Sequence, residues 1–455
     1  MTDTLPPRAR LACCVCNIAR RALRLLGRGG TNLPGLLAQR LCPTLPALLS
    51  RGVRILAVSG TNGKTTTCRM IAAGLSTAGI PFLANRSGAN LRAGVTAELA
   101  ANIRRGKPVK RVAVLECDEA ALRTLSGDVK PEILVFTNVF RDQLDRYGEV
   151  THTLSTLETA ARAAPEAMLC LNADDSLIAS LSLKCANPAR FYGVGVPVPH
   201  AHDGRSDAPN CVRCGHRYEY DYRTYAHLGG FFCPDCGWRR PTPEVEVTAV
   251  SSMDREGSGV VLRVGDALAK LRIPLPAVYN IYNALAAACA LHAFGVDTET
   301  ICDSMHAAAG FGRMERFDIG QGVTMILVKN PAGFTQVLDF LAGMEDFDLM
   351  CCLNDRAQDG RDISWIWDVP LEKLAAAQMR VREIYVSGTR GEEMLLRLKH
   401  AGLSSSSLHL VRRDPAFLRA FSAEVRPLVI VPTYTAMMRL RPVLAKRAGK
   451  RAFWE

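Results

Sequence analysis

Residues 59–66 read Ser-Gly-Thr-Asn-Gly-Lys-Thr-Thr and lie between a short β-branched run and a helical pattern. The backbone N–H groups of such a turn and the N-terminus of the following helix together bind phosphate groups. In this chemistry Lys64 reaches the terminal phosphates and the Thr65 hydroxyl ligates Mg²⁺. The usual pattern has one more glycine, where this chain has Val58. We interpret the loop as an ATP site, the alternative being a glycine-rich turn without function. The residues of this site are Gly60, Thr61, Asn62, Gly63, Lys64, Thr65 and Thr66.

Glu116 ends the next buried strand pattern along the chain. Ligands of open α/β sheets bind at the carboxyl ends of the strands, so Glu116 is expected at the same edge as the loop. A carboxylate there is a natural partner for the metal of a nucleotide. Asp118 and Glu119 follow, and any of the three acids could instead cap the next helix.

Two Cys-x-x-Cys pairs, Cys211 with Cys214 and Cys233 with Cys236, are separated by 18 residues. Each pair places two thiolates on one side of a tight turn, and two pairs complete a tetrahedral S₄ site. We predict a structural Zn²⁺ that serves folding or docking, because four ligands leave no open position for catalysis. A redox dithiol, the alternative, would need only one pair.

An acidic and aromatic loop follows the buried strand pattern at 348–353. Residues 354–368 contain four Asp, two Arg and two Trp. A loop of this kind at the end of a strand is a candidate functional site. The alternative is a solvated turn in which both Trp side chains are buried as anchors.

Composition limits the classes of protein to consider. The chain has 455 residues, of which 48% are hydrophobic and 22% charged, which excludes a disordered or fibrous protein. Its net charge of +12 favours anionic partners. Six Arg interrupt residues 8–28, unlike a signal peptide, so we expect the 16 cysteines to lie in a reducing cytoplasm. No apolar run reaches the about 18 residues of a spanning helix.

In the elements that must position these residues, short β-branched runs alternate with helical patterns. This alternation of strands and helices predicts a parallel, doubly wound sheet. After it, residues 196–243 break the alternation and are interpreted as an inserted segment. A second alternating set, ending in a basic helix, predicts a separate α/β domain. Expected strands are 54–58, 111–116, 132–138 and 167–173, then antiparallel 243–250, 259–264 and 269–276, then 324–328, 348–353, 383–388, 408–411 and 427–432; expected helices are 64–78, 280–294, 297–308, one from about 332, and 391–401.

Residues 8–27 predict a further helix with interleaved Arg. Its ordinary interpretation is a surface helix packed on the body of the protein. The alternative is a basic helix that lies on anionic lipid.

These motifs, in this order, resemble the Mur ligases and folylpolyglutamate synthases. Besides the loop and Glu116, the chain has T-N-x-x-x-D-x-L-D-x-x-G at 137–148 and N-x-D-D at 172–175. The resemblance implies that Asn280 of Asn-Ile-Tyr-Asn lies near the adenine and that Arg313 of Gly-Arg-Met-Glu contacts phosphate. It also implies that ATP phosphorylates a carboxylate and that an amine then attacks the acyl phosphate.

Departures from this pattern concern the incoming amine. Gln143 and Tyr147 stand where many Mur ligases have His, and Ile-Leu-Val-Lys-Asn-Pro at 326–331 replaces D-Y-A-H-N-P. We therefore expect the nitrogen to come from another source than a free amino acid.

The segment Asp-Gly-Arg-Asp-Ile-Ser-Trp at 359–365, with the four-cysteine insert, resembles the MurT subunits of lipid II isoglutaminyl synthase. The resemblance also covers 27–35, 387–390 and 431–435. It implies a heterodimer with a GatD-type glutaminase, which releases ammonia with its own Cys and His. Asp362 would complete that triad by orienting the imidazole, with Asp359 as its rival.

The resemblance thus implies amidation of the D-glutamate α-carboxylate of lipid II to D-isoglutamine, at the inner face of the membrane. Expected cofactors are ATP, Mg²⁺ and structural Zn²⁺. Alternatives are a stand-alone amino-acid ligase and a zinc-ribbon nucleic-acid or scaffold protein with a vestigial ATPase fold. A nucleic-acid partner is not expected, because the insert mixes acids and Tyr with its Arg. The expected organisation is a basic segment 1–50, a Mur ligase-like P-loop domain 51–317 carrying the zinc-ribbon insert 196–243, and a Rossmann-like α/β domain 318–455.

Overall fold

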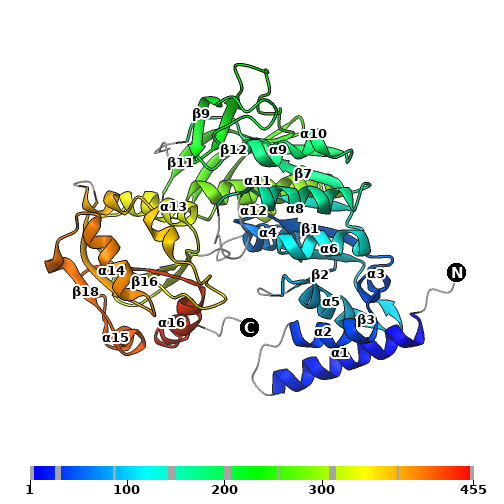
Figure 1. Cartoon of the computed structure of the whole chain (residues 1–455), viewed down its shortest axis with the longest axis horizontal. Helices are drawn as coiled ribbons and strands as arrows, with labels where there is room; N and C mark the ends of the chain where they lie inside the picture. Colours follow the sequence, from blue (N-terminus) through cyan, green and yellow to red (C-terminus); the bar gives the residue numbers. More distant parts are fainter. Residues whose placement is uncertain are drawn as a thin grey trace. The chain divides into compact units, whose positions relative to one another are not determined.

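The computed structural model describes residues 5–25, 32–85, 89–141, 150–198, 206–254, 256–306, 314–376 and 379–450 (Figure 1). The chain forms two compact units. Unit 1 consists of residues 1–140 and 150–309, and unit 2 of residues 141–149 and 310–455. None of the described helices is long and apolar enough to cross a membrane.

Unit 1 is built on a nine-stranded sheet of order β13-β12-β11-β8-β7-β6-β1-β5-β2. The strands from β2 to β11 are parallel, while β12 and β13 run antiparallel to their neighbours. The predicted strand at 243–250 is therefore antiparallel only on its β12 side, because it adds to β8 in parallel. The bounds are β1 Arg54–Ser59, β2 Phe82–Ala84, β5 Val112–Glu116, β6 Ile133–Phe136, β7 Met168–Asn172, β8 Ala189–Val194, β11 Val245–Met253, β12 Ser258–Val264 and β13 Ala267–Ile273.

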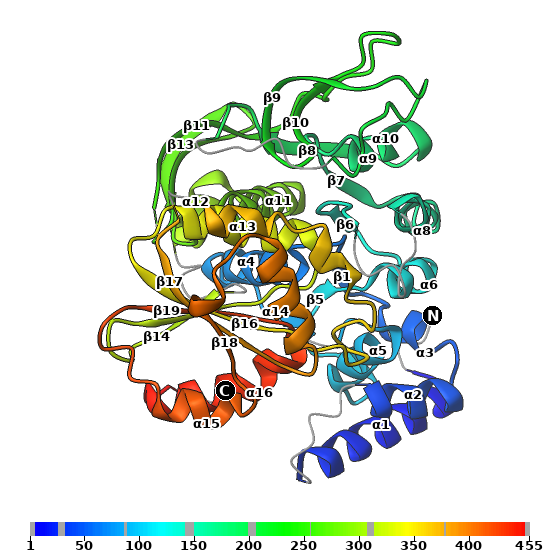
Figure 2. The same ribbon diagram turned by 60° about the vertical axis from the view of Figure 1, so that its left-hand side comes forward.

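Helices cover both faces of this sheet (Figure 2). This explains why the central strands are continuous apolar runs, for example the fully buried β5. One group consists of α4 Lys64–Thr77, α11 Val278–Phe294 and α12 Thr298–His306, and the other includes α3 Leu45–Leu49, α5 Arg92–Ala101, α6 Glu119–Val129 and α8 Val150–Arg162. The helices predicted at 64–78, 280–294 and 297–308 are confirmed within two residues at each end.

The first helices of the chain pack into unit 1. Helix α1 spans Pro7–Leu25 and α2 spans Asn32–Leu41, and both contact α5. The small residues Ala9, Ala12 and Cys16 of α1 are fully buried in the same core as α5. The helix predicted over 8–27 is therefore confirmed as a helix packed on the body of the unit.

The inserted segment lies between β8 and β11 and contains the antiparallel hairpin of β9 Glu219–Tyr225 and β10 Leu228–Phe232. Tyr218, Phe231 and two of the cysteines form a small core against Ala179 of the short helix α9, Ser176–Ala179. Helix α10, Leu181–Lys184, and the hairpin of β3 Ile103–Arg104 and β4 Lys107–Pro108 complete the unit.

Unit 2 is a six-stranded sheet of order β14-β15-β19-β16-β17-β18. All its pairs are parallel except that of β14 with β15, and β14 is an edge strand that the sequence analysis did not predict. The bounds are β14 Met314–Phe317, β15 Val323–Ile326, β16 Phe347–Cys352, β17 Val381–Ser387, β18 Leu408–Leu410 and β19 Leu428–Pro432, with α13 Pro331–Ala342, α14 Gly391–His400, α15 Asp414–Ala420 and α16 Tyr434–Arg447; short 3-10 helices lie at 364–367, 371–375 and 405–407.

Candidate functional site

The phosphate loop connects β1 to α4 and requires glycine at two positions. Gly60 has a φ of 125° and Gly63 a φ of 88°. A Cβ atom at Gly60 would lie 2.4 Å from Thr137 Oγ1, and one at Gly63 would lie 2.0 Å from Asn283 Oδ1. Both glycines thus allow a left-handed backbone and a close approach of other chain segments, as expected for a phosphate-binding turn.

The end of β6 holds this loop in place. Asn138 accepts hydrogen bonds from Thr61 N with its carbonyl and from Asn62 N with its Oδ1, both at 2.9 Å. The Thr137 hydroxyl donates to the Asn62 carbonyl at 2.7 Å. The Thr-Asn pair of the predicted T-N-x-x-x-D motif therefore shapes the loop. It leaves the first turn of α4, whose N–H groups have no carbonyl partner within the helix, to receive an anion.

The loop lysine and threonine each meet a carboxylate at the carboxyl edge of the sheet. Lys64 Nζ lies 2.8 Å from Glu119 Oε1, and the Thr65 hydroxyl donates to Glu116 Oε2 at 2.8 Å. Burial alone lowers the pKa of Lys64, but the carboxylates of Glu119, Asp118 and Glu116 outweigh burial and raise that pKa. Lys64 is thus held charged where phosphate is expected.

The three acids after β5 have three different partners. Asp118 caps α6 by accepting from Ala120 N, so it is the capping residue among the three. Glu116 lies at the same sheet edge as the phosphate loop, as expected, and accepts a hydrogen bond from Thr65, whereas the pairing of Glu119 with Lys64 was not predicted. The sequence contained one signal for the pairing of Glu119 with Lys64, because Glu119 stands at the start of the helix that follows Glu116.

Two asparagines that the sequence analysis did not single out position Glu116. Asn85 exchanges two hydrogen bonds of 2.8 Å with the Glu116 backbone, and Asn90 Nδ2 lies 3.5 Å from Glu116 Oε1. These residues follow the edge strand β2, and no motif marks them in the sequence.

The N-x-D-D motif connects the site to the inserted segment. Asp175 accepts from Val139 N at 2.9 Å, and the ring of Phe140, the next residue, lies 4.7 Å from that of His227. His227, in the β9–β10 turn, is fully buried, with its Nε2 3.5 Å from Asp175 Oδ1. Because Phe140 N donates to Thr61 Oγ1 at 3.1 Å, the hairpin contacts a segment that itself holds the phosphate loop.

Asp174, the other acid of this motif, is fully buried and pairs with the partly buried Arg240, its Oδ1 lying 2.6 Å from Arg240 Nε. Burial raises the pKa of Asp174 above its usual range, and Arg240 opposes that shift. Arg240 and Tyr282, which donates to Asp174 at 2.6 Å, attach the insert and α11 to the strand end.

Asn280 is buried, where it donates to the Pro276 carbonyl at 2.6 Å and accepts from Asn283 at 3.2 Å. The described structure thus places Asn283, rather than Asn280, next to the phosphate loop. Arg313, Gln143 and Tyr147 lie outside the described residues.

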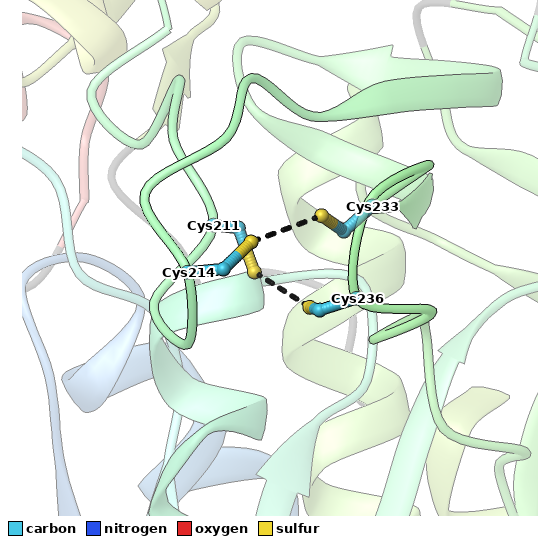
Figure 3. Close-up of side chains that lie close together, drawn as sticks. All are labelled: Cys211, Cys214, Cys233 and Cys236. Atoms are coloured by element: carbon cyan, nitrogen blue, oxygen red, sulfur yellow. Dashed lines mark hydrogen bonds between the residues drawn. The ribbon is translucent and has the colours of Figure 1, made fainter.

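The four cysteines of the insert form one cluster, in which all four Sγ atoms lie within 4.8 Å of one another (Figure 3). Cys211 Sγ lies 3.6 Å from Cys236 Sγ, and Cys214 Sγ lies 3.5 Å from Cys233 Sγ. A tetrahedral Zn²⁺ with Zn–S bonds of about 2.3 Å separates its sulfurs by about 3.8 Å, so the cluster fits this ion. Burial opposes ionisation of Cys211, but backbone N–H donors lower its pKa to about 6.

Three cysteines outside this cluster are buried thiols. Cys117, Cys351 and Cys352 are each 1% exposed. Burial raises the pKa of all three, that of Cys352 to about 12. Thiols of this kind are poor nucleophiles.

In unit 2, the loop 354–368 follows β16, and its two candidate acids differ. Asp359 is 4% exposed and accepts from Thr435 N at 2.7 Å, at the start of α16. Asp362 is partly exposed and accepts from Ser364 N at 2.8 Å. The alternative in which both Trp side chains are buried is wrong for one of them, because Trp365 is 7% exposed and Trp367 51%.

The strand order of unit 1, with a phosphate loop after the interior strand β1, defines a Mur ligase-like α/β protein. Its structure is similar to MurF from Acinetobacter baumannii, with a TM-score of 0.65 at 17% identity over 91% of this chain and 81% of that chain. A pseudomurein peptide ligase type C from Methanothermus fervidus has a TM-score of 0.64 at 19% identity over 87% and 79%. These likenesses concern the fold alone.

Sequence comparison identifies the branch of this class. Residues 58–200 match the Mur ligase middle domain, and residues 327–437 match the MurT ligase C-terminal family. The chain is 33% identical over 432 residues to the MurT subunit of lipid II isoglutaminyl synthase (glutamine-hydrolyzing) from Streptococcus pneumoniae. It is 34% identical over 433 residues to that of Staphylococcus aureus, and both alignments cover 93% of this chain and 94% of the relative. The chain belongs to the MurT family and is a ligase subunit.

Proposed function

We propose that this chain catalyses the ATP-dependent amidation of lipid II, converting the α-carboxylate of its D-glutamate to the amide of D-isoglutamine. The observation that carries the proposal is the similarity to two MurT subunits of lipid II isoglutaminyl synthase over 93% of the chain. Because the reaction uses ATP, we infer that it takes place in the cytoplasm, where the chain meets the membrane through its lipid-linked substrate.

The phosphate loop is the proposed ATP site, formed by Gly60–Thr66. Mg²⁺ bound with ATP neutralises the charge that develops on the transferred phosphoryl group. Thr65 and Glu116, whose oxygens lie 2.8 Å apart, are the proposed side chains for this ion. When ATP binds, the Lys64 ammonium group leaves Glu119 and pairs with the terminal phosphates instead. It thus replaces one ion pair by another within the same buried site.

The acceptor carboxylate gains a phosphoryl group and becomes an acyl phosphate, and ADP leaves. Ammonia then attacks the acyl carbon, phosphate leaves with the bonding electrons, and the nitrogen loses a proton. Two further contacts belong to the proposal: Arg313 on the phosphates and Asn280 on the adenine side. In the structure Asn283 contacts the phosphate loop itself. We therefore expect substitution of Asn283 to lower activity more than substitution of Asn280.

Ammonia comes, in this proposal, from a GatD-type glutaminase that forms a heterodimer with the chain. Asp362 is the proposed third member of the glutaminase triad, orienting its histidine and stabilising the charged imidazole. The contacts support Asp362 over Asp359, because Asp359 is buried against Thr435 while Asp362 is partly exposed.

The four-cysteine cluster is proposed as a zinc ribbon with a structural Zn²⁺. Its sulfur separations fit the ion, and the hairpin between its two Cys pairs contacts Asp175 through His227. We therefore propose that the metal fixes the hairpin against the segment that holds the phosphate loop. The proposed domains are 51–317 with insert 196–243, and 318–455, after a basic segment 1–50.

Mass spectrometry of the lipid product tests the proposal. The chain co-expressed with a GatD-type partner, given ATP, Mg²⁺ and glutamine, is expected to convert a carboxyl group of lipid II to a carboxamide. ATP turnover stimulated by a free amino acid without the partner would instead support a stand-alone ligase. Unchanged lipid II under complete conditions would contradict the proposal.

A further inference from the structure

Helix α1 exposes a line of large apolar side chains on the face opposite the one it buries. Leu11 is 58% exposed, Ile18 62% and Leu25 89%. Their spacing of seven residues places them on one line along the helix, since two helical turns span about seven residues. A solvent-facing side of a surface helix is ordinarily polar, so this line is unlike the outer face of a packed helix.

The neighbouring helix α2 also exposes large apolar side chains. Leu33 is 51% exposed and Leu36 48%, and α2 packs directly against α1. Both ribbon views show α1 and α2 side by side at one end of unit 1, with α1 outermost (Figures 1 and 2). We call the five residues Leu11, Ile18, Leu25, Leu33 and Leu36 the apolar ridge. None of the described elements of unit 1 covers these side chains of α1.

Arginines border the apolar ridge. At about 100° per residue, Arg10 and Arg21 lie roughly 60–80° to one side of the α1 line and Arg8 about as far to the other. All three are exposed, as is Arg40 at the end of α2. Arg20 is on the buried side, where it pairs with Glu98 at 2.7 Å.

Residues 5–25 and 32–53 contain no Asp or Glu at all. The two segments that carry the apolar ridge therefore bring positive charge and no acid of their own. This positive charge indicates which partner binds the apolar ridge. A second copy of the chain would place its own arginines opposite these arginines, and the repulsion would be unfavourable. An anionic lipid surface instead offers acyl chains to the apolar side chains and phosphates to the arginines.

We propose that the apolar ridge and its arginines dock unit 1 on an anionic membrane. The leucines and Ile18 enter the boundary between headgroups and acyl chains, and Arg8, Arg10, Arg21 and Arg40 contact lipid phosphates. The docking itself does not depend on the proposed substrate. If the substrate is lipid-linked, docking also brings the chain to the surface that holds it.

Flotation of the full chain with lipid vesicles tests the proposal. We expect binding to vesicles that contain phosphatidylglycerol, weaker binding to pure phosphatidylcholine, and loss of binding as salt is raised. The double variant Leu11→Ser/Ile18→Ser should weaken binding by roughly 10²-fold, because two large side chains no longer leave water. Arg10→Gln/Arg21→Gln should weaken binding about 30-fold.

Matched controls lie elsewhere on the surface. Leu268→Ser, at a site 66% exposed on β13, and Arg412→Gln, at a side chain 81% exposed, should leave vesicle binding unchanged. Thermal unfolding checks that all variants fold alike. Equal binding to both vesicle types, or equal losses in the controls, would overturn the proposal. So would a dimer in size-exclusion chromatography that Leu11→Ser/Ile18→Ser dissociates, since the ridge would then join two copies.

Failure of this proposal is distinguishable from failure of the proposed function. Amidation of detergent-dispersed lipid II should be unchanged in the ridge variants, because they leave the phosphate loop intact. Vesicle binding without any amidation would leave the docking proposal standing and contradict only the function.

Discussion

The phosphate loop of unit 1 and the loop 354–368 of unit 2 both follow a parallel strand that has neighbours on each side, yet they are held differently. In the first, Thr61 and Asn62 are fixed by Asn138, and Lys64 by a buried carboxylate. In the second, one acid is buried and Asp362 and Trp367 are presented outward. The difference is the one expected between a loop prearranged for a small ligand and a loop that contributes to a site completed by a second protein.

The largest effect is expected from Asp362→Asn. Replacing a triad Asp by Asn leaves the geometry but costs about 10⁴-fold, because the imidazole is no longer oriented and stabilised. Glutamine-driven amidation should fall on that scale, while amidation driven by added ammonium salt should continue. Steady-state rates with both nitrogen donors measure this.

The matched control for Asp362 is Asp368→Asn on the same loop, which should keep glutamine-driven activity. If Asp362→Asn retained that activity, or lost both activities equally, the second loop would not contribute to a partner's site and the contrast between the loops would fail.

Lys64→Ala should reduce turnover with either nitrogen donor by roughly 10²–10³-fold, the cost of removing one preorganised charge from a transition state. Comparing glutamine with ammonium as nitrogen donor therefore distinguishes the two loops. Substitution of Lys64 slows both reactions, whereas substitution of Asp362 slows only the glutamine-driven one. Lys270→Ala, an exposed lysine of β13, serves as the control. An ATPase rate unaffected by Lys64→Ala would exclude the loop as the ATP site.

Glu119→Gln should destabilise the ligand-free chain by about 3 kcal/mol, because it leaves the Lys64 charge buried without its partner. Bound ATP should restore most of that loss by supplying phosphate in place of the carboxylate. The shift of the unfolding temperature on adding ATP is therefore expected to be larger in the variant than in the unmodified chain. An equal or smaller shift would mean that Glu119 does not compete with phosphate for Lys64.

The smallest effect is expected from Asp359→Asn. Thr435 N donates to this carboxylate, and loss of its charge should cost about 1–3 kcal/mol of unfolding free energy. Denaturant titration measures it, and glutamine-driven turnover of the folded variant should stay close to normal. A selective loss of that turnover would make Asp359, instead of Asp362, the residue offered to the partner.

Local signals in the sequence were enough for much of this structure. The glycine spacing of the phosphate loop, the two Cys pairs and the apolar runs of the parallel strands each lie within a few neighbouring residues, and the structure contains the predicted elements. The position of Glu116 at the same sheet edge as the phosphate loop was also predictable, from a general rule on parallel sheets, and the structure adds its contact with Thr65.

Contacts between distant segments were not predictable in the same way. Lys64 and Glu119 are 55 residues apart, and nothing near either one selects the pair. Asn85, Asn90 and His227 lie in segments without a recognisable motif, and the edge strand β14 is four residues long. The exposure of Trp367 depends on the packing of α14, against which the 364–367 helix lies, and an apolar residue type predicts burial instead.

The most direct test of the central claim couples ATP consumption to the lipid substrate. The purified chain with a GatD-type glutaminase, glutamine, ATP and Mg²⁺ is assayed for ADP release with and without lipid II, and the lipid is weighed by mass spectrometry. We predict that ADP release depends on lipid II and matches the amount of carboxamide formed. ADP release at the same rate without lipid II, with the lipid unchanged when it is present, would contradict the claim.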